Sequence, residues 1–315
     1  MSKCLYCYQE LDDSTKVDYH SKCIKAFYGA YEAPVLPYRL DEMEKLAKES
    51  VLLSVSVPGV QPKLSMGWLK NKLQDDRNGR LTIMDAFEGQ FILKPQNAKF
   101  SQMPENEHLS MRLAELFSID VVPSSLIRLD SGELCYLTKR IDRKKDKSKI
   151  HMIDFLQIME LEDKYLGTME NLGKSIGELS SNTLLDKLRF FELTLFNFII
   201  GNNDMHLKNF SMIHTDMGWI LSPAYDLLNV RIIFPKDDED TALLLGGKKK
   251  NFDKNYFDRF GVVLKLNERQ ITAVYKKLDK WLPKALLLIE ASFLNEQNKS
   301  QYKELITKRI SLFTL

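Results

Sequence analysis

The feature that most constrains the fold is the polar stretch at residues 201–211, GNNDMHLKNFS, together with its flanks. Residues 184–200 carry apolar side chains at helical spacing and lead directly into this stretch. A β-hairpin pattern follows it, with a turn at 215–218. A folded hairpin would bring Asn209, at its start, close to Asp226, beyond its end.

An acid, an amide and a second acid around one loop are the groups that phosphoryl transfer uses. In this interpretation Asp204 accepts the proton of the substrate hydroxyl, and Asn209 and Asp226 hold Mg²⁺ on the nucleotide phosphates. The spacing Asp-x-x-x-x-Asn matches the catalytic loop of kinases. The same residues also occur at ordinary helix exits, so the rest of the chain has to agree. His206 is expected to order the loop.

Composition excludes several classes of protein. The chain has 315 residues, enough for one large or two modest domains, and its net charge of +2 argues against a dedicated nucleic-acid binder. Apolar runs of about 18 residues are lacking, so no membrane span is expected. The first residues, MSKC, have no apolar core of a signal peptide, which predicts a cytoplasmic, reducing location.

The first half of the chain is rich in β patterns. A helix is expected at 104–118, directly after a strand that ends in Lys94. That lysine is predicted to reach the α- and β-phosphates of ATP, with Glu107 of the helix as its partner. The strand patterns lie at 51–57, from 64, at 81–84, 90–95, 121–129 and 133–140.

A strand–loop–strand around Pro58-Gly59 has the shape to cover phosphates with backbone N–H groups. When this segment is considered alone, a plain hairpin is the favoured interpretation. The other ATP contacts are expected at a hinge formed by Leu137, Thr138 and Lys139, and at His206 and Lys208. The loop residues expected to contact ATP are Ser56, Val57, Pro58, Gly59, Val60, Gln61 and Lys63.

The second half has helical apolar periodicity at 153–160, 170–180 and 184–200, and two or three amphipathic helices at 267–312. We therefore predict an α+β class and a two-lobed protein-kinase-like fold, with a β-rich N-lobe and a helical C-lobe. The expected divisions are a Cys/His segment at 1–30, the nucleotide-binding small lobe at 31–142 and the catalytic large lobe at 143–315.

The N-terminal segment contains Cys4-x-x-Cys7 and, twelve residues later, His20-x-x-Cys23. Thiolates and an imidazole at this spacing predict a Zn²⁺ site, and four ligands would leave no open position for catalysis. The alternative is that these are small buried residues of a short capping hairpin.

Several stretches together resemble the HipA-like serine/threonine kinase toxins of bacterial toxin–antitoxin systems. The resemblance spans residues of about 50 to 230 in order. It rests on SVPGVQPK at 56–63, FILKP at 91–95, Asn106-Glu107 with MRLA at 111–114, the 201–211 loop and PAYDL at 223–227. The N-terminal Cys/His segment is similar to one in shorter members.

The resemblance implies roles for individual residues. Asp204 corresponds to the catalytic base, Asn209 and Asp226 to the Mg²⁺ ligands, and Lys94 to the lysine on the ATP phosphates. The loop serine of the family is autophosphorylated. Ser54 and Ser56 stand here as a Ser-x-Ser pair, which resembles the HipT subtype. A phosphoserine adds about −1.5 to −2 charges, which would repel a bound triphosphate.

The resemblance also implies partners. Family substrates are aminoacyl-tRNA synthetases, here a tryptophanyl- or glutamyl-tRNA synthetase, phosphorylated to inhibit translation. A helix-turn-helix, DNA-binding antitoxin is implied, together with a separate small antitoxin that replaces the N-terminal subdomain of HipA. Direct contact of this chain with nucleic acid or membrane is not expected.

Three alternatives remain open at the level of sequence. A small-molecule phosphotransferase of the same fold shares the Asp-x-x-x-x-Asn loop and the later Asp. An ATP-binding pseudokinase would use the fold as an interaction module. A metal-dependent hydrolase using Asp204, His206 and Asp226 has the least support, because no H-x-x-x-H pair accompanies it.

Overall fold

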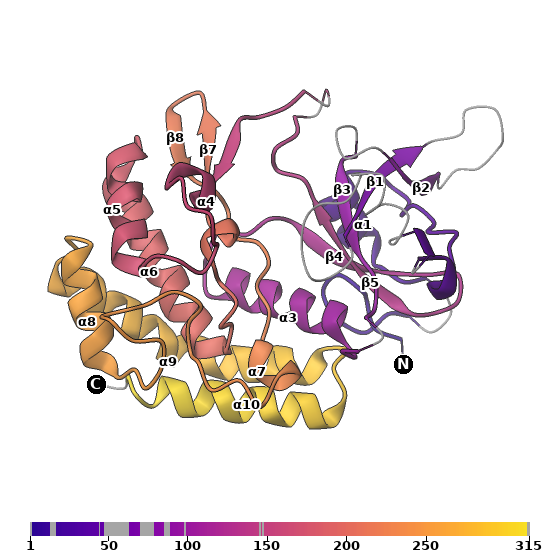
Figure 1. Cartoon of the computed structure of the whole chain (residues 1–315). Helices are drawn as coiled ribbons and strands as arrows, with labels where there is room; N and C mark the ends of the chain where they lie inside the picture. The colour runs from indigo at the N-terminus through magenta and orange to yellow at the C-terminus, as the bar shows by residue number, and fades with distance from the viewer. Residues whose placement is uncertain are drawn as a thin grey trace. The chain divides into compact units, whose positions relative to one another are not determined.

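The chain divides into a β-rich unit and a helical unit (Figure 1). The β-rich unit comprises Met1–His108, Val122–Ser148 and Ala291–Phe293, and the helical unit comprises Leu109–Val121, Lys149–Glu290 and Leu294–Leu315. The computed structural model describes residues 2–12, 17–43, 45–46, 63–69, 79–84, 89–97, 99–144, 146 and 148–313. The predicted autophosphorylation and phosphate-loop residues Ser54, Ser56, Val57, Pro58, Gly59, Val60 and Gln61 lie outside them.

The β-rich unit is built on a five-stranded antiparallel sheet of order β2-β1-β3-β5-β4. The segments from 64, at 81–84, 90–95, 121–129 and 133–140 form strands as predicted, although β2 and β3 are not neighbours because β1 lies between them. The strands are β1 Leu64–Leu69, β2 Arg80–Ile83, β3 Phe91–Lys94, β4 Ser124–Arg128 and β5 Leu134–Lys139.

β5 is an almost continuous apolar strand because it is covered on both faces. Its residues from Leu134 to Thr138 are all buried. The N-terminal segment packs against the sheet: Phe27 of α1 (Ser21–Tyr28) lies 6.1 Å from the Phe91 ring, and the Leu126 N–H donates to the Leu5 carbonyl at 3.3 Å. The Cys/His segment is thus part of the β-rich unit.

The helical unit is organised around α6 (Thr183–Ile200), which is buried on every side from Phe190 onwards (Figure 1). A helix that is apolar all round belongs inside a core. The Phe196 ring contacts Trp281 and Phe117. The elements around it are β6 Met152–Asp154, α4 Phe155–Ile158, α5 Met169–Leu179, β7 Ser211–Thr215, β8 Gly218–Leu221, α7 Val230–Ile233, α8 Lys254–Val263, α9 Glu268–Ala291 and α10 Glu296–Ile310.

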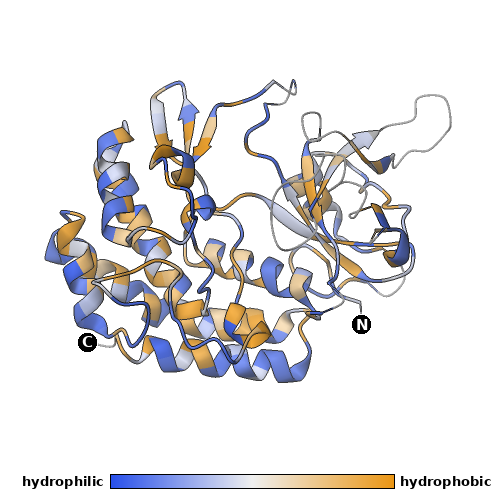
Figure 2. Ribbon diagram, viewed as in Figure 1, coloured by the Kyte–Doolittle hydropathy of each residue, from blue (hydrophilic) through white to orange (hydrophobic). Residues whose placement is uncertain are grey.

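Most predicted helices are confirmed, and one is partly wrong. The 104–118 helix is α3 (Met103–Leu116), which begins in the β-rich unit and continues into the helical one. The 267–312 tail forms two amphipathic helices, with hydrophilic and apolar residues interleaved along α10 (Figure 2). Of the 153–160 helix, the first residues belong instead to strand β6, because they pair with β7.

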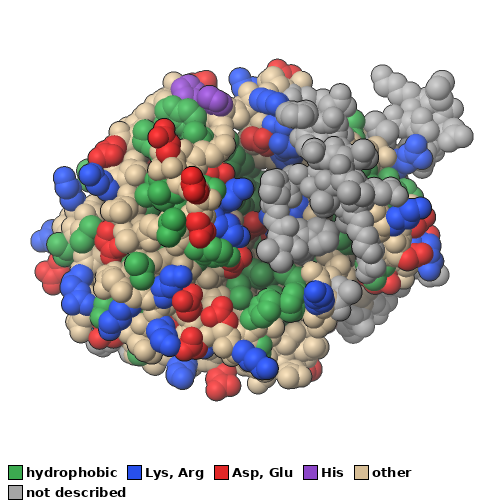
Figure 3. Space-filling view, in the orientation of Figure 1, with side chains coloured by type: hydrophobic (Ala, Val, Ile, Leu, Met, Phe, Trp, Pro, Cys, Tyr) green, Lys and Arg blue, Asp and Glu red, His purple; other side chains and the backbone are tan. Residues whose placement is uncertain are grey.

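The predicted hairpin is present as β7 and β8, with His214 opposite Trp219 and Thr215 opposite Gly218. On the helical unit's visible surface, acidic and basic side chains are interspersed (Figure 3), in keeping with a net charge of +2. Among the described residues, no helix combines the length and the apolar character that crossing a membrane requires.

Candidate active site

The polar loop begins where α6 ends at Gly201. This glycine adopts a left-handed conformation with φ of +78°, and its N–H donates to the Phe198 carbonyl. The Asn202 side chain then donates to the Asn197 side chain at 2.9 Å, and the Asn202 N–H to the Asn197 carbonyl at 2.9 Å. The buried helix therefore fixes the direction in which the loop leaves it.

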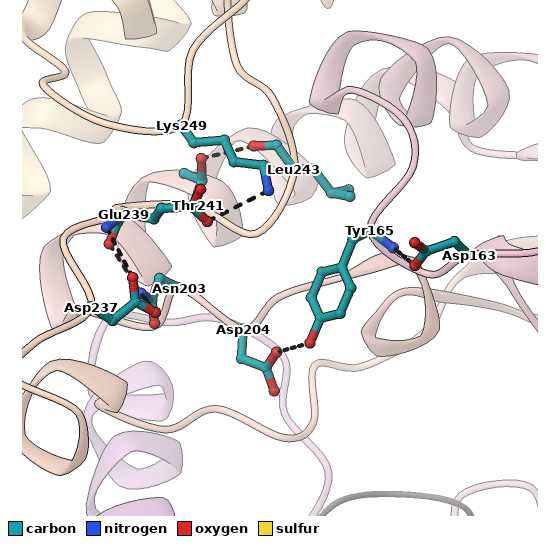
Figure 4. Close-up of polar contacts among 9 residues, drawn as sticks. All are labelled: Asp163, Tyr165, Asn203, Asp204, Asp237, Glu239, Thr241, Leu243 and Lys249. Atoms are coloured by element: carbon teal, nitrogen blue, oxygen red, sulfur yellow. Dashed lines mark hydrogen bonds and ion pairs between the residues drawn. The ribbon is translucent and has the colours of Figure 1, made fainter.

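Asp204, the predicted base, is exposed and points toward Tyr165, whose hydroxyl donates to its Oδ1 at 2.9 Å (Figure 4). Tyr165 was not predicted as a site residue, because the 160–167 segment has no periodic pattern that singles it out. Burial raises the pKa of Tyr165, and the negative charge of Asp204 raises it further, so the phenol stays a donor. The Asp204 carboxylate is thus oriented by the Tyr165 hydroxyl and stays exposed, so a substrate can reach it.

Asn209 lies in the 3₁₀ turn Leu207–Asn209 and is buried. Its side-chain nitrogen donates to the Asp204 carbonyl at 3.0 Å, and its backbone N–H donates to the His206 carbonyl at 2.9 Å. Because the amide nitrogen is committed to the loop backbone, the amide oxygen is the atom that can coordinate a metal ion.

Asp226 is half-buried and has a φ of +57°, which is uncommon for a residue with a side chain. Such a conformation costs about 1–2 kcal/mol, and it often marks a functional residue. The preceding Tyr225 fixes its position, because the Tyr225 hydroxyl contacts the Lys208 carbonyl at 3.1 Å and the Ser211 hydroxyl at 2.5 Å. These contacts hold the chain entering Asp226 against the residues that flank Asn209.

His206 is buried within the loop. Burial lowers its pKa, and the positive charge of Lys164 adds to this, while Asp204 and Asp226 act in the opposite direction. The imidazole therefore interacts electrostatically with both carboxylates and stays neutral near pH 7. Its buried Nδ1 has no hydrogen-bond partner among the residues that the structure describes.

A second anchor of the loop was also missed from the sequence. The Asn203 side chain donates to the Asp237 carboxylate at 2.8 Å and to the Glu239 carbonyl at 3.0 Å (Figure 4). Asp237 and Glu239 lie in the polar run at 236–240, to which the sequence assigned no role. Asn203 therefore anchors the loop one residue before Asp204, while Tyr165 holds the Asp204 side chain.

The β-rich unit holds the other predicted group, Lys94. Its Nζ lies 2.5 Å from Glu107 Oε1, and both side chains are buried, so the expected pairing of a β3 lysine with an α3 glutamate is present. The Nζ also lies 5.4 Å from the centre of the Tyr136 ring. A buried ion pair of this kind holds the lysine in one orientation.

The other described residues that were predicted to contact ATP lie in β5, at the start of the described segment before β1, and in the 3₁₀ turn. Leu137 and Thr138 lie inside β5, and their backbones pair with β3 on one side and with β4 on the other. Lys139 ends the strand and is half-exposed, as are Lys63 and Lys208. The segment after Lys139 is thus the part of this region that leaves the sheet.

Mg²⁺ prefers carboxylate and amide oxygens, and these are what Asp226 and the free end of Asn209 offer. Asn209 precedes hairpin β7–β8 and Asp226 follows it, so the two ends of the hairpin supply an amide oxygen and a carboxylate. The donor set of the helical unit is therefore compatible with the metal that kinases use.

Comparison with known proteins agrees with this arrangement. A chain from the solved complex of Shewanella oneidensis MR-1 HipA, HipB and operator DNA superposes with a TM-score of 0.69 at 18 % identity, covering 89 % of this chain and 72 % of that one. The fold is a kinase-like α+β fold. A model of the HipA-like C-terminal domain matches residues 55–286, and the chain therefore belongs to the HipA-like family.

Two curated relatives extend the likeness. The Sinorhizobium fredii protein named "Putative kinase Y4dM" is 35 % identical over 220 residues, which cover 65 % of this chain and 51 % of the relative. The serine/threonine-protein kinase toxin HipA of Shewanella oneidensis is 22 % identical over 302 residues, covering 84 % of this chain and 68 % of the relative. This chain thus spans about half the length of the first relative.

Proposed function

We propose that this protein is an ATP- and Mg²⁺-dependent serine/threonine protein kinase that acts as the toxin of a bacterial toxin–antitoxin system in the cytoplasm. The observation that carries the proposal is the loop at 201–211. Asp204 offers an exposed carboxylate, and the Asn209 side chain donates to the Asp204 carbonyl. The hydroxyl of Tyr225, the residue before Asp226, donates to the Lys208 carbonyl of the same loop. The kinase names of the relatives support the same class of reaction.

In this proposal Asp204 accepts the proton of a serine or threonine hydroxyl, while Tyr165 holds the carboxylate in position. Asn209 and Asp226 hold the metal, which when bound neutralises charge on the phosphates. Lys94, oriented by Glu107, contacts the α- and β-phosphates. His206, whose pKa is lowered by burial, orders the 207–209 turn, where its carbonyl accepts a hydrogen bond from the Asn209 N–H.

The finer parts of the proposal concern substrate and regulation. An aminoacyl-tRNA synthetase, tryptophanyl- or glutamyl-, is the proposed substrate, and Ser54 and Ser56 are the proposed sites of autophosphorylation. The similar Shewanella chain forms a complex with HipB and operator DNA. A DNA-binding antitoxin is accordingly the proposed partner here, with a separate small antitoxin as a second one.

The test is incubation of the purified protein with Mg²⁺ and γ-labelled ATP, followed by peptide mass spectrometry. We expect phosphate on the peptide that contains Ser54 and Ser56. The Asp204→Asn variant should lose the label and retain nucleotide binding, because it removes the base and leaves the proposed metal ligands in place. Ser54→Ala with Ser56→Ala should remove self-labelling as well.

Other outcomes would assign the protein to a different functional class or change the role of Asp204. Intact ATP binding with label transferred only to small molecules would identify a small-molecule phosphotransferase of the same fold. ATP binding with no transfer to any acceptor would identify a pseudokinase. Label that persists in the Asp204→Asn variant would contradict the role given to Asp204.

A further inference from the structure

The N-terminal segment contains a second chemical cluster that phosphoryl transfer does not use. The side-chain ligand atoms of Cys4, Cys7, His20 and Cys23 all lie within 4.8 Å of one another. His20 Nδ1 lies 3.5 Å from the Cys7 sulfur and 3.9 Å from the Cys23 sulfur. Tetrahedral Zn²⁺ with ordinary Zn–S and Zn–N bonds separates its sulfur and nitrogen ligands by about 3.6 Å. The cluster therefore has the dimensions of one zinc site.

Local backbone structure explains why the four side chains converge. Residues 4–8 form a tight turn in which the Tyr8 N–H donates to the Cys4 carbonyl at 2.9 Å. His20 is the N-cap residue of α1, and the Cys23 N–H donates to the His20 carbonyl at 2.9 Å. An N-cap side chain usually accepts a hydrogen bond from the first turn, but His20 makes no such bond. Its ring is instead directed at the thiols.

The far side of the His20 ring is also arranged as in metal sites. Its Nε2 lies 3.0 Å from the Glu10 carbonyl, which can only accept a hydrogen bond. When Nε2 donates this bond, the proton is on Nε2 and the lone pair is on Nδ1, the atom that faces the sulfurs. Histidine ligands of zinc are commonly oriented by such a backbone carbonyl.

We propose that Cys4, Cys7, His20 and Cys23 bind one Zn²⁺ in a closed, structural site. Three thiolates and an imidazole in a tetrahedral arrangement select zinc over Mg²⁺ or Ca²⁺, which prefer oxygen ligands. Four protein ligands fill the coordination sphere, so this ion has no position for a substrate. Binding replaces the thiol protons, which are released to solvent.

The ion would hold together a segment that supports the Lys94 pair. The Tyr19 hydroxyl donates to the Leu126 carbonyl of β4 at 2.6 Å, and the Tyr8 hydroxyl lies 2.8 Å from His108 Nδ1 in α3. His108 follows Glu107, the partner of Lys94. Metal at the cluster therefore fixes the turn whose Tyr8 contacts α3 beside the ion pair.

The test is the metal content of the full-length protein, purified without a polyhistidine tag and analysed by inductively coupled plasma mass spectrometry. We expect one zinc per chain. Cys7→Ala should lower the zinc content at least about 10-fold after dialysis against a chelator. Cys135→Ala is the matched control, because Cys135 is a buried cysteine of β5 outside the cluster, and it should keep one zinc.

A second measurement uses the wild-type protein alone and so does not depend on a variant that folds. Replacing zinc by Co²⁺ should give the intense ligand-field bands of a tetrahedral site and thiolate-to-cobalt charge-transfer absorption. Absence of these bands, iron in place of zinc, a mass lower by two hydrogens that marks a disulfide, or full zinc retention in Cys7→Ala would each overturn the proposal. Metal content does not depend on kinase activity, so the two proposals can fail separately.

Discussion

At the residue scale, the contacts that position Asp204 leave its carboxylate exposed to solvent. Tyr165 donates to one carboxylate oxygen, while the carboxylate itself stays exposed. Hydrogen bonds hold the neighbouring side chains in place: Asn203 donates to the Asp237 carboxylate, and Asn209 donates to the Asp204 carbonyl. A reactive side chain on a loop works when its neighbours keep the backbone rigid and leave the side chain open.

A buried carboxyl in the β-rich unit gives a prediction about pH. Burial raises the pKa of Glu105 above its usual value of 4.5, although Gln96 donates to both of its oxygens at 2.8 and 3.0 Å. As pH rises, the unfolded chain loses this proton before the folded chain does, so ionisation of Glu105 lowers stability. We expect Glu105→Gln to gain stability relative to wild type as pH rises from about 4 to about 7.

Urea unfolding midpoints across this range measure the effect. Glu304→Gln, at an exposed position of α10, is the matched control for removing one carboxylate. A stability difference between Glu105→Gln and wild type that shrinks with rising pH would have the wrong sign for a buried acid.

At the scale of elements, the C-terminus of α6 decides where the catalytic loop starts. Three separate elements meet there: the glycine that ends α6, the residues before α7 and the helix α10. Phe198, in the last turn of α6, has its carbonyl bonded by Arg309 of α10, whose guanidinium also stacks 4.5 Å from the Phe198 ring centre. The position of the loop therefore depends on residues distant in the sequence.

Gly201→Ala tests the helix end. A Cβ at Gly201 would lie 2.6 Å from Leu305 Cδ2 and 3.0 Å from Arg231 Cγ, in addition to the cost of about 1–2 kcal/mol for a left-handed alanine. We expect lower thermal stability and a lower rate of phosphoryl transfer. Gly247→Ala is the control, because it has a φ of +79° and nothing within 4 Å of its Cβ position. Equal losses in both variants would show that the contacts around Gly201 are unimportant.

Arg309→Met tests the support from α10. The arginine is 6 % exposed and pairs with Asp240, so its loss leaves a mostly buried carboxylate and a helix-end carbonyl without their cation. Breaking such a pair costs about 3–5 kcal/mol in free energy of unfolding. Lys254→Met, which breaks the more exposed pair with Asp258, should cost less than about 1 kcal/mol in the same denaturant titrations. Similar costs for the two would contradict the structural role of Arg309.

At the scale of the whole molecule, the residues proposed to bind Mg²⁺-ATP are divided between the units: Lys94 belongs to the β-rich unit, and Asn209 and Asp226 belong to the helical unit. A ligand that binds only the folded chain stabilises it by mass action. Mg²⁺-ATP at 100 times its dissociation constant should therefore add about 2.7 kcal/mol to the free energy of unfolding.

Thermal unfolding of variants then separates the roles of the site residues. Asp204→Asn should keep the stabilisation by Mg²⁺-ATP, because the base is not needed for binding. Asp226→Asn should lose the magnesium-dependent part, and Lys94→Met should weaken the nucleotide-dependent part. A large loss of stabilisation in Asp204→Asn, with Asp226→Asn unaffected, would reverse the assignment of base and metal ligand.

The sequence by itself determined the order of most elements and the residues that form the candidate site. Apolar periodicity identified α3, α5, α6 and the hairpin after the loop, because a buried face forces its residues to recur with the period of the element. The sequence revealed the spacing of Asp204, Asn209 and Asp226 because these residues lie close together along the chain. The Cys/His pattern was recognisable for the same reason. The family resemblance rested on the same short motifs.

Only the tertiary structure decided what holds these groups. Tyr165 and Asp237 reach the loop from segments without periodicity, and β6 replaced part of an expected helix because β7 lies beside it. β1 separates β2 from β3, and Arg309 closes the end of α6 from the last helix. Such contacts join residues far apart in the sequence. Local pattern carries no information about them, because packing and hydrogen-bond partners are chosen only when the chain has folded.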